Sequence, residues 1–282
     1  MGISGRVAIS MILSGPVIAL ASLTSVRAAP VEVAPHVYRI GTIQSPIITE
    51  SSGLVASRIY PGVFWTHNDS DEYLVAMTRK GATLGTYIVT GVHMEDWEDI
   101  AADGAGNLYL ADIGDNNIRR TSLVVYKVRE PNAYSTGTIK PIQTYYLSFP
   151  GEPADCESFF VLKGYGYLIT KPLTIRSKAT IYRFPLTASY ATLEFVTRVS
   201  VADKVTAADI SRDKSRLAIL TQKGAYCFFI NGNVSTIQSA SYVYTPYSNN
   251  YVEGACFAGT GLMVSGEAPE IYLFNDPAFQ TW

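Results

Sequence analysis

The sequence predicts an all-β protein built as a single β-propeller of five blades with four strands each. Two observations lead to this prediction. Short runs rich in Val, Ile, Tyr, Phe and Leu alternate with Gly, Asn, Asp and Pro turns throughout the chain after residue 28, which is typical of many short strands. Similar segments also recur at spacings close to the ~40–50 residues of a propeller blade.

The first 28 residues have the pattern of a secretory signal peptide. Arg6 precedes the apolar run VAISMILSGPVIALASL, and compact residues end the segment at Ala28. A glycine and a proline interrupt the run, and no later apolar stretch approaches the ~18 residues of a membrane-spanning helix. We therefore expect a mature propeller domain of residues 29–282 that is secreted or periplasmic and not inserted in a membrane.

Composition argues against nucleic acid as a partner. The chain has 282 residues, 48% hydrophobic and 16% charged, with a formal net charge of -2, so it is long enough to fold around a large core and has no excess of basic residues for nucleic acid. Its three cysteines, an odd number without metal-site spacing, are expected to be buried free thiols. We expect a monomer whose partner is a small molecule or another extracytoplasmic ligand.

Five segments supply the two inner strands of the five blades. We place their equivalent positions at Ser52, Glu98, Glu157, Ala208 and Glu253, which are separated by 46, 59, 51 and 45 residues. Residues 253–282 and 29–51 together have the length of one blade, so the strand HVYRIGTI (36–43) is expected to be the outer strand of the last blade. Six blades stay an alternative, because the 59-residue interval has room for additional strands.

Acidic residues recur where the inner strands begin and where the second strands end. Because these two strands of a blade are antiparallel, both places lie on one face of the ring, near its axis. Carboxylates that converge raise one another's pKa unless a cation neutralises them, and oxygen ligands without a His or Cys cluster favour Ca²⁺ over Zn²⁺. We predict a Ca²⁺ site with the ligands Ser52, Glu98, Glu157, Asp209 and Glu253.

Two functions fit such a site. In a metal-dependent hydrolase of phosphoesters or related anions, Glu98 or Asp112 would act as the base and Lys171 would hold the substrate. The predicted substrate-binding residues on the same face are His67, Asn68, Asp69, Asp115, Asn116 and Arg119. The alternative is a binding or scaffold propeller in which the cation is structural, and fold alone does not separate the two.

Other polar and aromatic residues have structural interpretations. Asp103-Gly104 and Asp213-Lys214 fit the turns between the first two strands of a blade. Asp115-Asn116 fits a loop cap as well as a binding site. Trp65 and Trp97 are expected to pack between blades.

Four motifs resemble those of a family of exported bacterial propellers of the WD40/TolB-like type, mostly of unknown function. These motifs are ESSGL (50–54), WTHNDS (65–70), DWEDIA (96–101) and DIGDN (112–116). Ser52, Glu98, Glu157 and Glu253 are also similar in phase to the Ser and Glu ligands of calcium-activated, apyrase-type nucleotidases, which are five-bladed propellers with Ca²⁺ on the axis. The fourth blade departs from that pattern, because Ala208 stands where a hydroxyl or carboxylate is expected, with Thr206 and Asp209 nearby.

Overall fold

The computed structural model describes residues 1–2, 29–172 and 178–281. The predicted signal peptide lies, beyond its first two residues, outside the described residues. The helices of the described part are two short 3-10 turns, η1 (Val234–Thr236) and η2 (Pro277–Phe279). Among the described residues, no helix has the length and apolar character needed to cross a bilayer.

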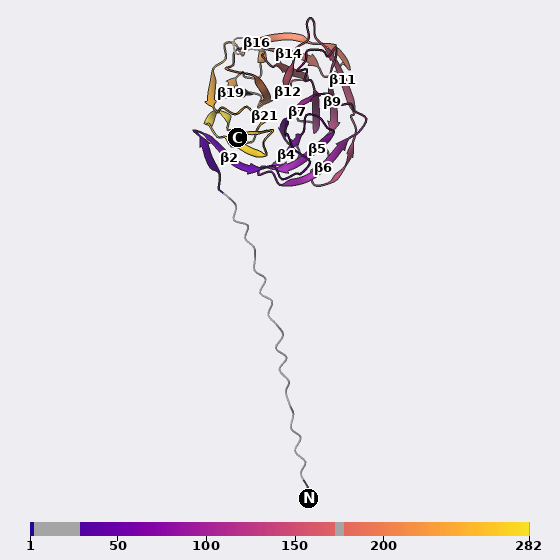
Figure 1. Cartoon of the computed structure of the whole chain (residues 1–282), viewed down its shortest axis with the longest axis vertical. Coiled ribbons are helices and arrows are strands. Elements are labelled where there is room, and N and C mark those ends of the chain that lie inside the picture. The colour runs from indigo at the N-terminus through magenta and orange to yellow at the C-terminus, as the bar shows by residue number, and fades with distance from the viewer. Residues whose placement is uncertain (3–28, 173–177, 282) are drawn as a thin grey trace.

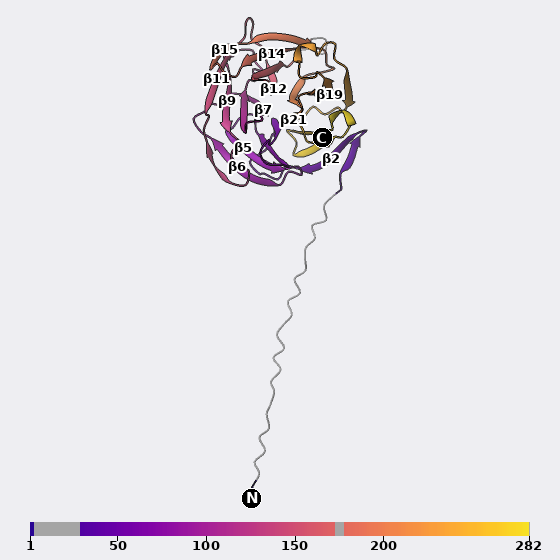
Figure 2. The same cartoon turned by 180° about the vertical axis from the view of Figure 1, so that it is seen from behind.

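Five sheets arranged as a ring make up the fold (Figure 1), and the ring is equally plain from behind (Figure 2). From the axis outward, the first blade is β3 (Gly53–Ala56), β4 (Val63–His67), β5 (Tyr73–Thr78) and β6 (Thr83–Val89). The second is β7 (Trp97–Ala102), β8 (Asn107–Asp112), β9 (Leu123–Arg129) and β11 (Gln143–Ser148). The third is β12 (Cys156–Leu162), β13 (Tyr165–Thr170), β14 (Ala179–Pro185) and β16 (Glu194–Val199). The fourth is β17 (Val205–Ile210), β18 (Arg216–Thr221), β19 (Gly224–Phe229) and β20 (Tyr242–Pro246). The predicted propeller of five four-stranded blades is confirmed once the fifth blade is included.

The fifth blade joins the two ends of the described chain. Its strands are β21 (Val252–Phe257), β22 (Leu262–Gly266), β23 (Glu270–Phe274) and β2 (Val37–Thr42). β2 pairs antiparallel with β23, from Val37 opposite Phe274 to Thr42 opposite Glu270. The prediction that residues 36–43 form the outer strand of the last blade is therefore confirmed, and this pairing closes the ring.

Three blades carry a fifth, outermost strand. β1 (Val31–Ala34) pairs with β2, β10 (Thr136–Ile139) pairs in parallel with β6 of the first blade, and β15 (Tyr190–Thr192) pairs in parallel with β11 of the second. β10 comes from the long interval between Glu98 and Glu157, but it extends the edge of the preceding blade. The six-bladed alternative is therefore wrong.

The core lies between neighbouring sheets. Trp65 and Trp97 are fully buried in the cluster between the first two blades, and Trp65 Nε1 donates a hydrogen bond to Glu130 Oε1 at 2.8 Å. Both tryptophans therefore pack between blades, as predicted. Cys156, Cys227 and Cys256 are buried free thiols, also as predicted.

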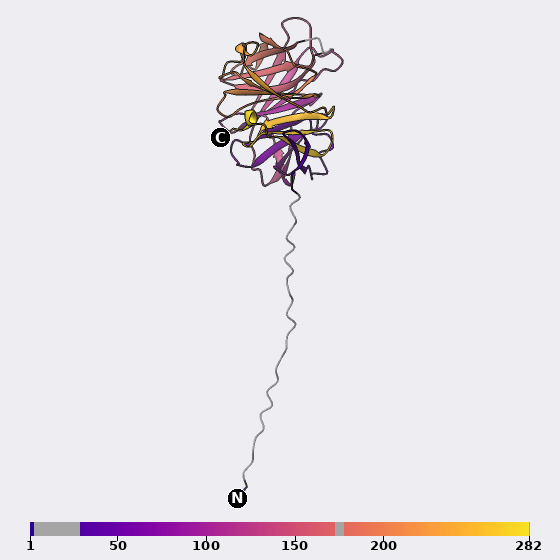
Figure 3. The ribbon, with the colours of Figure 1, turned by 90° about the vertical axis from the view of Figure 1, so that its left-hand side faces the viewer.

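The five inner strands approach one another closely around the axis, and the strands run along this axis when the ring is seen from the side (Figure 3). A Cβ atom added to Gly254 of β21 would lie 2.9 Å from Leu54 Cβ and 3.0 Å from the Gly53 carbonyl carbon in β3. A Cβ on Gly53 would lie 3.1 Å from Asp99 Cα in β7. Glycine is required where these three strands begin side by side, because real Cβ atoms almost never come so near another atom.

The turns between the first two strands of each blade lie on one face of the ring. In the second blade, Asp103 Oδ1 accepts hydrogen bonds from the backbone N–H groups of Ala105 and Asn107, at 2.8 and 3.0 Å. In the fourth, Asp213 Oδ1 accepts one from Ser215 N–H at 3.0 Å. Both aspartates form turns, as the sequence predicts. We call this side of the ring the turn face, and the opposite side, where the inner strands begin, the acidic face.

Ring closure by β2 can be tested with a matched pair of substitutions. Val37 of β2 is fully buried against Phe274 and Phe279, whereas Val33 of β1 is 43% exposed. We expect Val37→Ala to lower the free energy of unfolding by about 1–2 kcal/mol through lost apolar burial, and Val33→Ala to change it by less than about 0.5 kcal/mol. Urea unfolding of both variants measures the difference, and equal effects would contradict closure by this strand.

Candidate functional site

Four of the five inner strands have one irregularly paired residue where they begin. The pairing of the inner two strands shifts between Trp97 and Asp99, between Cys156 and Ser158, between Val205 and Ala207, and between Val252 and Gly254. The extra residue of such a β-bulge is unpaired and its side chain is turned out of the regular alternation. In the first blade the corresponding residue precedes Gly53, and its backbone N–H donates to His67 O at 3.0 Å. The five positions, which we call the axial ring, are Ser52, Glu98, Glu157, Thr206 and Glu253.

In the fourth blade, the predicted equivalent position, Ala208, is wrong. Thr206, not Ala208, occupies the bulge, because Val205 pairs with Thr221 and Ala207 pairs with Leu220. Ala208 instead packs in the core between the third and fourth blades. Thr206 is buried, and its Oγ1 has no hydrogen-bond partner within the described part of the chain.

Asp209, predicted as a ligand, lies farther along β17 than the axial ring. Its Oδ1 accepts from Ile210 N–H and its Oδ2 from Phe257 N–H of the next blade, both at 2.8 Å. Arg58 Nη2 lies 4.0 Å from Oδ1. Burial raises the pKa of Asp209 to about 6, against the opposing effect of Arg58. The structure thus places Asp209 in a link between the inner strands of the fourth and fifth blades.

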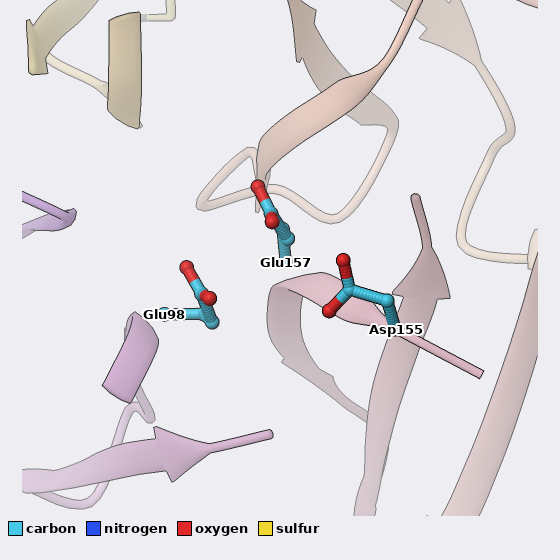
Figure 4. Close-up of side chains that lie close together, drawn as sticks. All are labelled: Glu98, Asp155 and Glu157. Atoms are coloured by element: carbon cyan, nitrogen blue, oxygen red, sulfur yellow. The ribbon is translucent and has the colours of Figure 1, made fainter. Parts of the chain in front are cut away.

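Three buried carboxylates from two blades lie together on the acidic face. Glu98, Asp155 and Glu157 are 8, 5 and 4% exposed, and one oxygen from each lies within 4.8 Å of the others (Figure 4). We call this group the acidic cluster. Asp155 Oδ1 is held in place by the backbone N–H of Asp115, which donates to it at 2.8 Å.

Asp155 was not among the predicted site residues. It precedes Glu157 by two residues, as Asp96 precedes Glu98 one blade earlier, so both bulges have the pattern Asp-x-Glu. This repeat is a signal in the sequence from which Asp155 could have been found.

The hairpin of the second blade brings both of its ends to the acidic cluster. Trp97 pairs with Asp112, and Gly114 N–H donates to Asp96 O at 3.1 Å. A Cβ on Gly114 would overlap the carboxyl groups of both Glu98 and Asp96. Burial raises the pKa of Asp96, and the charge of Asp96 adds to the raised pKa of Glu98.

Burial changes the protonation of the acids around the cluster. It raises the pKa of Glu98 well above its usual range, with Glu157 and Asp96 adding to the effect. It raises the pKa of Glu157 to about 7, although Lys171 opposes it. Glu253, which is half-buried, has its pKa raised to about 8 by burial and by the charges of Glu157 and Glu267. Negative charge therefore accumulates here at a free-energy cost.

Lys171 brings an ammonium group to the acidic cluster. Its Nζ forms an ion pair with Glu157 and lies 3.9 Å from Asp155 Oδ2. Burial alone would lower the pKa of Lys171, but the charges of Glu157, Asp155 and Glu98 raise it. The lysine is therefore charged and partly neutralises the cluster.

Asp112 and Asp115, predicted as base and binding residue, are engaged by the loop that follows β8. Asp112 Oδ1 accepts from Arg120 Nη1 at 2.8 Å and from Asp96 N–H at 2.9 Å. Asp115 accepts from the backbone N–H groups of Arg119 and Arg120, both at 2.8 Å. Asp115 therefore caps the loop.

The predicted substrate-binding residues do not share one pocket. Asn68 is buried and fixes a loop, since its Oδ1 accepts from Thr49 and Glu50 N–H at 3.0 and 3.2 Å. Asn116 and Arg119 are exposed, and Arg119 lines a shallow cavity of about 500 Å³ on the loop after β8. Asp69 is half-buried on the acidic face, where its charge contributes to the raised pKa of Glu253.

His67 is buried beside the start of β7. Its ring stacks on Trp97, with centroids 3.7 Å apart and planes 6° apart. Nδ1 lies 2.8 Å from Asn68 O, so it carries the proton, and Nε2 has no partner among the described residues. Burial lowers the pKa of His67 to about 3, so the imidazole is neutral and its Nε2 presents a lone pair.

Comparison with known proteins adds no family. No protein-family model matches the chain, and no curated protein matches it. The family resemblances expected from the motifs therefore stay predictions.

Several solved structures are similar at low identity. A nidogen/laminin complex matches over 77% of this chain and 72% of its own, with 12% identity and a TM-score of 0.46. The Dos1 propeller matches over 79% of this chain, with 12% identity and a TM-score of 0.39. Hydrazine synthase of Kuenenia stuttgartiensis matches over 79%, with 13% identity and a TM-score of 0.42. The chain spans 57% of the length of each of the latter two.

The neutral state of His67 predicts a pH-dependent contribution to stability. The unfolded chain binds a proton at His67 below about pH 6.5, whereas the folded chain does not until about pH 3. The contribution of neutral His67 to the free energy of unfolding is therefore complete above pH 6.5 and decreases as the pH falls toward 3. We expect the difference in unfolding free energy between the wild type and His67→Gln to shrink by about 1–2 kcal/mol between pH 7 and pH 5. Urea unfolding at both pH values measures it, and a constant difference would show that His67 titrates equally in both states.

Proposed function

We propose that the protein is an exported β-propeller that binds Ca²⁺ at the acidic cluster and uses it to hydrolyse a phosphoester or a related anionic small molecule. The observation that carries this proposal is the convergence of three buried carboxylates, Glu98, Asp155 and Glu157, within 4.8 Å. Buried carboxylates are costly unless a cation or protons compensate them. Lys171 supplies one positive charge for the three acids, so the cluster favours a further cation.

The geometry and the donor atoms fit Ca²⁺. Two oxygens bound to one Ca²⁺ at ~2.3–2.6 Å lie at most about 5 Å apart, which matches the 4.8 Å limit of the cluster. The cluster offers only carboxylate oxygens, which hard cations prefer. Thr206 Oγ1, buried at the same level and without a partner in the described chain, provides a further oxygen near the axis.

The side chains around the cluster suit hydrolysis of an anion. A bound divalent cation supplies positive charge that polarises a phosphoryl oxygen and lowers the pKa of water. Glu253 is less buried than Glu98 and Glu157, the other two carboxyl groups of the axial ring, and we assign it the role of base, because Asp112 is already held by Arg120. Lys171 would orient the substrate through its ammonium group.

A non-catalytic binding propeller is the second candidate. Glu98 and Glu157 come from adjacent inner strands and are each less than a tenth exposed, so a cation between them would also hold the second and third blades together. In this case the protein would bind an extracytoplasmic ligand without turnover. In both cases we propose a secreted or periplasmic monomer, supported by the signal-peptide pattern of residues 1–28.

Cation binding predicts a rise in thermal stability. Ca²⁺ at 100 times its dissociation constant would stabilise the folded state by about 2.7 kcal/mol, or about 5–10 °C in melting temperature. Glu98→Gln should abolish this rise, while the exposed Glu32→Gln of β1 should retain it. Differential scanning calorimetry with Ca²⁺ and with chelator measures both, and an unchanged wild-type melting temperature would refute the site.

Gly114 provides a second test that keeps every carboxylate. A methyl group at Gly114 would displace Glu98 and Asp96, whereas one at Gly104 meets no atom within 4 Å. Neither glycine has a left-handed φ, so the substitutions add no backbone strain. We expect Gly114→Ala to weaken Ca²⁺ affinity at least about tenfold, through displaced ligands, and Gly104→Ala to leave it unchanged. Calorimetric titration with Ca²⁺ measures both, and equal affinities would place the ion elsewhere.

An activity screen separates the two candidate functions. We expect Ca²⁺-loaded protein to hydrolyse at least one class among nucleotides, other phosphomonoesters and phosphodiesters, and Glu253→Gln to slow turnover by about 10²–10⁴-fold, as for the loss of a general base. Release of phosphate or alcohol measures turnover. Ca²⁺ binding without turnover on any substrate would favour the binding propeller.

A further inference from the structure

The turn face has a cavity on the side of the ring opposite the acidic cluster. The cavity has a volume of about 410 Å³ and is lined by the hairpin turns of the second, third and fourth blades and by Arg58 at the end of β3. A second cavity of about 350 Å³ adjoins the turns of the first and fifth blades, and Arg58 and Arg212 line both cavities. These two arginines therefore lie where turns from all five blades meet.

Basic side chains dominate the first cavity. Its lining includes Arg58, Lys163, Arg212 and Lys214. The single acidic residue of the lining is Asp103, and its carboxylate is occupied within its own turn by Asn107 and by the Tyr109 hydroxyl at 2.9 Å. The charge of this cavity is therefore positive and lacks a free counter-ion among the residues that line it.

Both guanidinium groups have unused hydrogen-bond donors. The acidic partner of Arg58 is Asp209, whose Oδ1 lies 4.0 Å away, too far for a hydrogen bond. Arg212 is exposed and donates no side-chain hydrogen bond to any described residue. A planar guanidinium group binds a tetrahedral or planar oxyanion through two parallel hydrogen bonds.

Two of the hairpin turns have a lysine in a left-handed backbone conformation, which glycine adopts with less strain. Lys163 has a φ of 49° and Lys214 a φ of 64°, and residues with a Cβ seldom adopt such angles. Both lysines line the cavity, and Lys163 Nζ uses one of its three donors on Gly232 O at 2.8 Å. Strained residues of this kind gather at functional sites.

We propose that this cavity binds a phosphate group, free or as the monoester of a small molecule, through Arg58, Arg212, Lys163 and Lys214. The volume suits a small ligand, and Val161, Leu186 and Ile210 add apolar surface beside the charges. This site is separate from the proposed cation site, because the two lie at opposite ends of the inner strands.

Calorimetric titration of the purified full chain with inorganic phosphate, at low salt and with chelator present, tests the site. We expect saturable binding that weakens as salt is added, and a loss of affinity of at least about tenfold in the double variant Arg212→Gln/Lys214→Gln. The matched control, Lys140→Gln/Lys178→Gln, removes two exposed positive charges outside the cavity and should bind as the wild type does. Glu98→Gln should also bind phosphate normally, so failure of the cation site is distinguishable from failure of this one.

A second titration with glycerol phosphate identifies the source of the phosphate group. Tighter binding than that of inorganic phosphate supports a monoester ligand that uses the apolar wall, and equal binding supports the free anion. No saturable binding of either probe to the wild type, or equal binding to the double variant and its control, would overturn the proposal.

Discussion

The close approach of five inner strands to one axis is the constraint on which the candidate site depends. β3, β7 and β21 begin so near one another that Gly53 and Gly254 have no room for a side chain. At this level the pairing of four blades shifts by one residue, and the extra residue is turned out of the ladder. Polar side chains from every blade therefore meet where little solvent reaches. A sandwich of two sheets has no comparable place where five strand starts converge.

Because buried carboxyl groups converge at this site, its stability depends mainly on how their negative charges are neutralised. The fold buries Glu98 and Asp96, which raises the pKa of both, and pairs Lys171 with Glu157. Both arrangements lower the negative charge of the cluster without a metal ion. A divalent cation would compete with protons and with the ammonium group, so its affinity depends on the protonation of the carboxyl groups and on Lys171 as well as on the carboxylates.

The repeat was predictable because each blade has the same alternation of strands and turns, and the count of residues at the two ends predicted closure by residues 36–43. The register of the fourth blade was not predictable, because a bulge adds a residue without changing the apolar pattern, and Ala208 and Thr206 fit it equally well. Asp112 was predicted as a catalytic base, but Arg120, eight residues later, forms an ion pair with it. The alternation of apolar and polar residues predicts the strands, whereas the pairing of buried charges depends on how the loops fold against the strand ends.

The up-and-down path of each blade also separates the chemistry of the two faces. The turns between the first two strands of each blade lie on one face of the ring, and the inner strands begin on the other. Lys163 and Lys214 therefore lie on the opposite face from Glu98 and Glu157. β7, with six residues, separates the two ends by about 16–20 Å, which exceeds the Debye length of about 8 Å at physiological salt. A cation at one end and a phosphate at the other would therefore affect each other only weakly through solvent. Asp209 lies on β17 between the two ends, and its Oδ1 is 4.0 Å from Nη2 of Arg58, which lines the turn-face cavity.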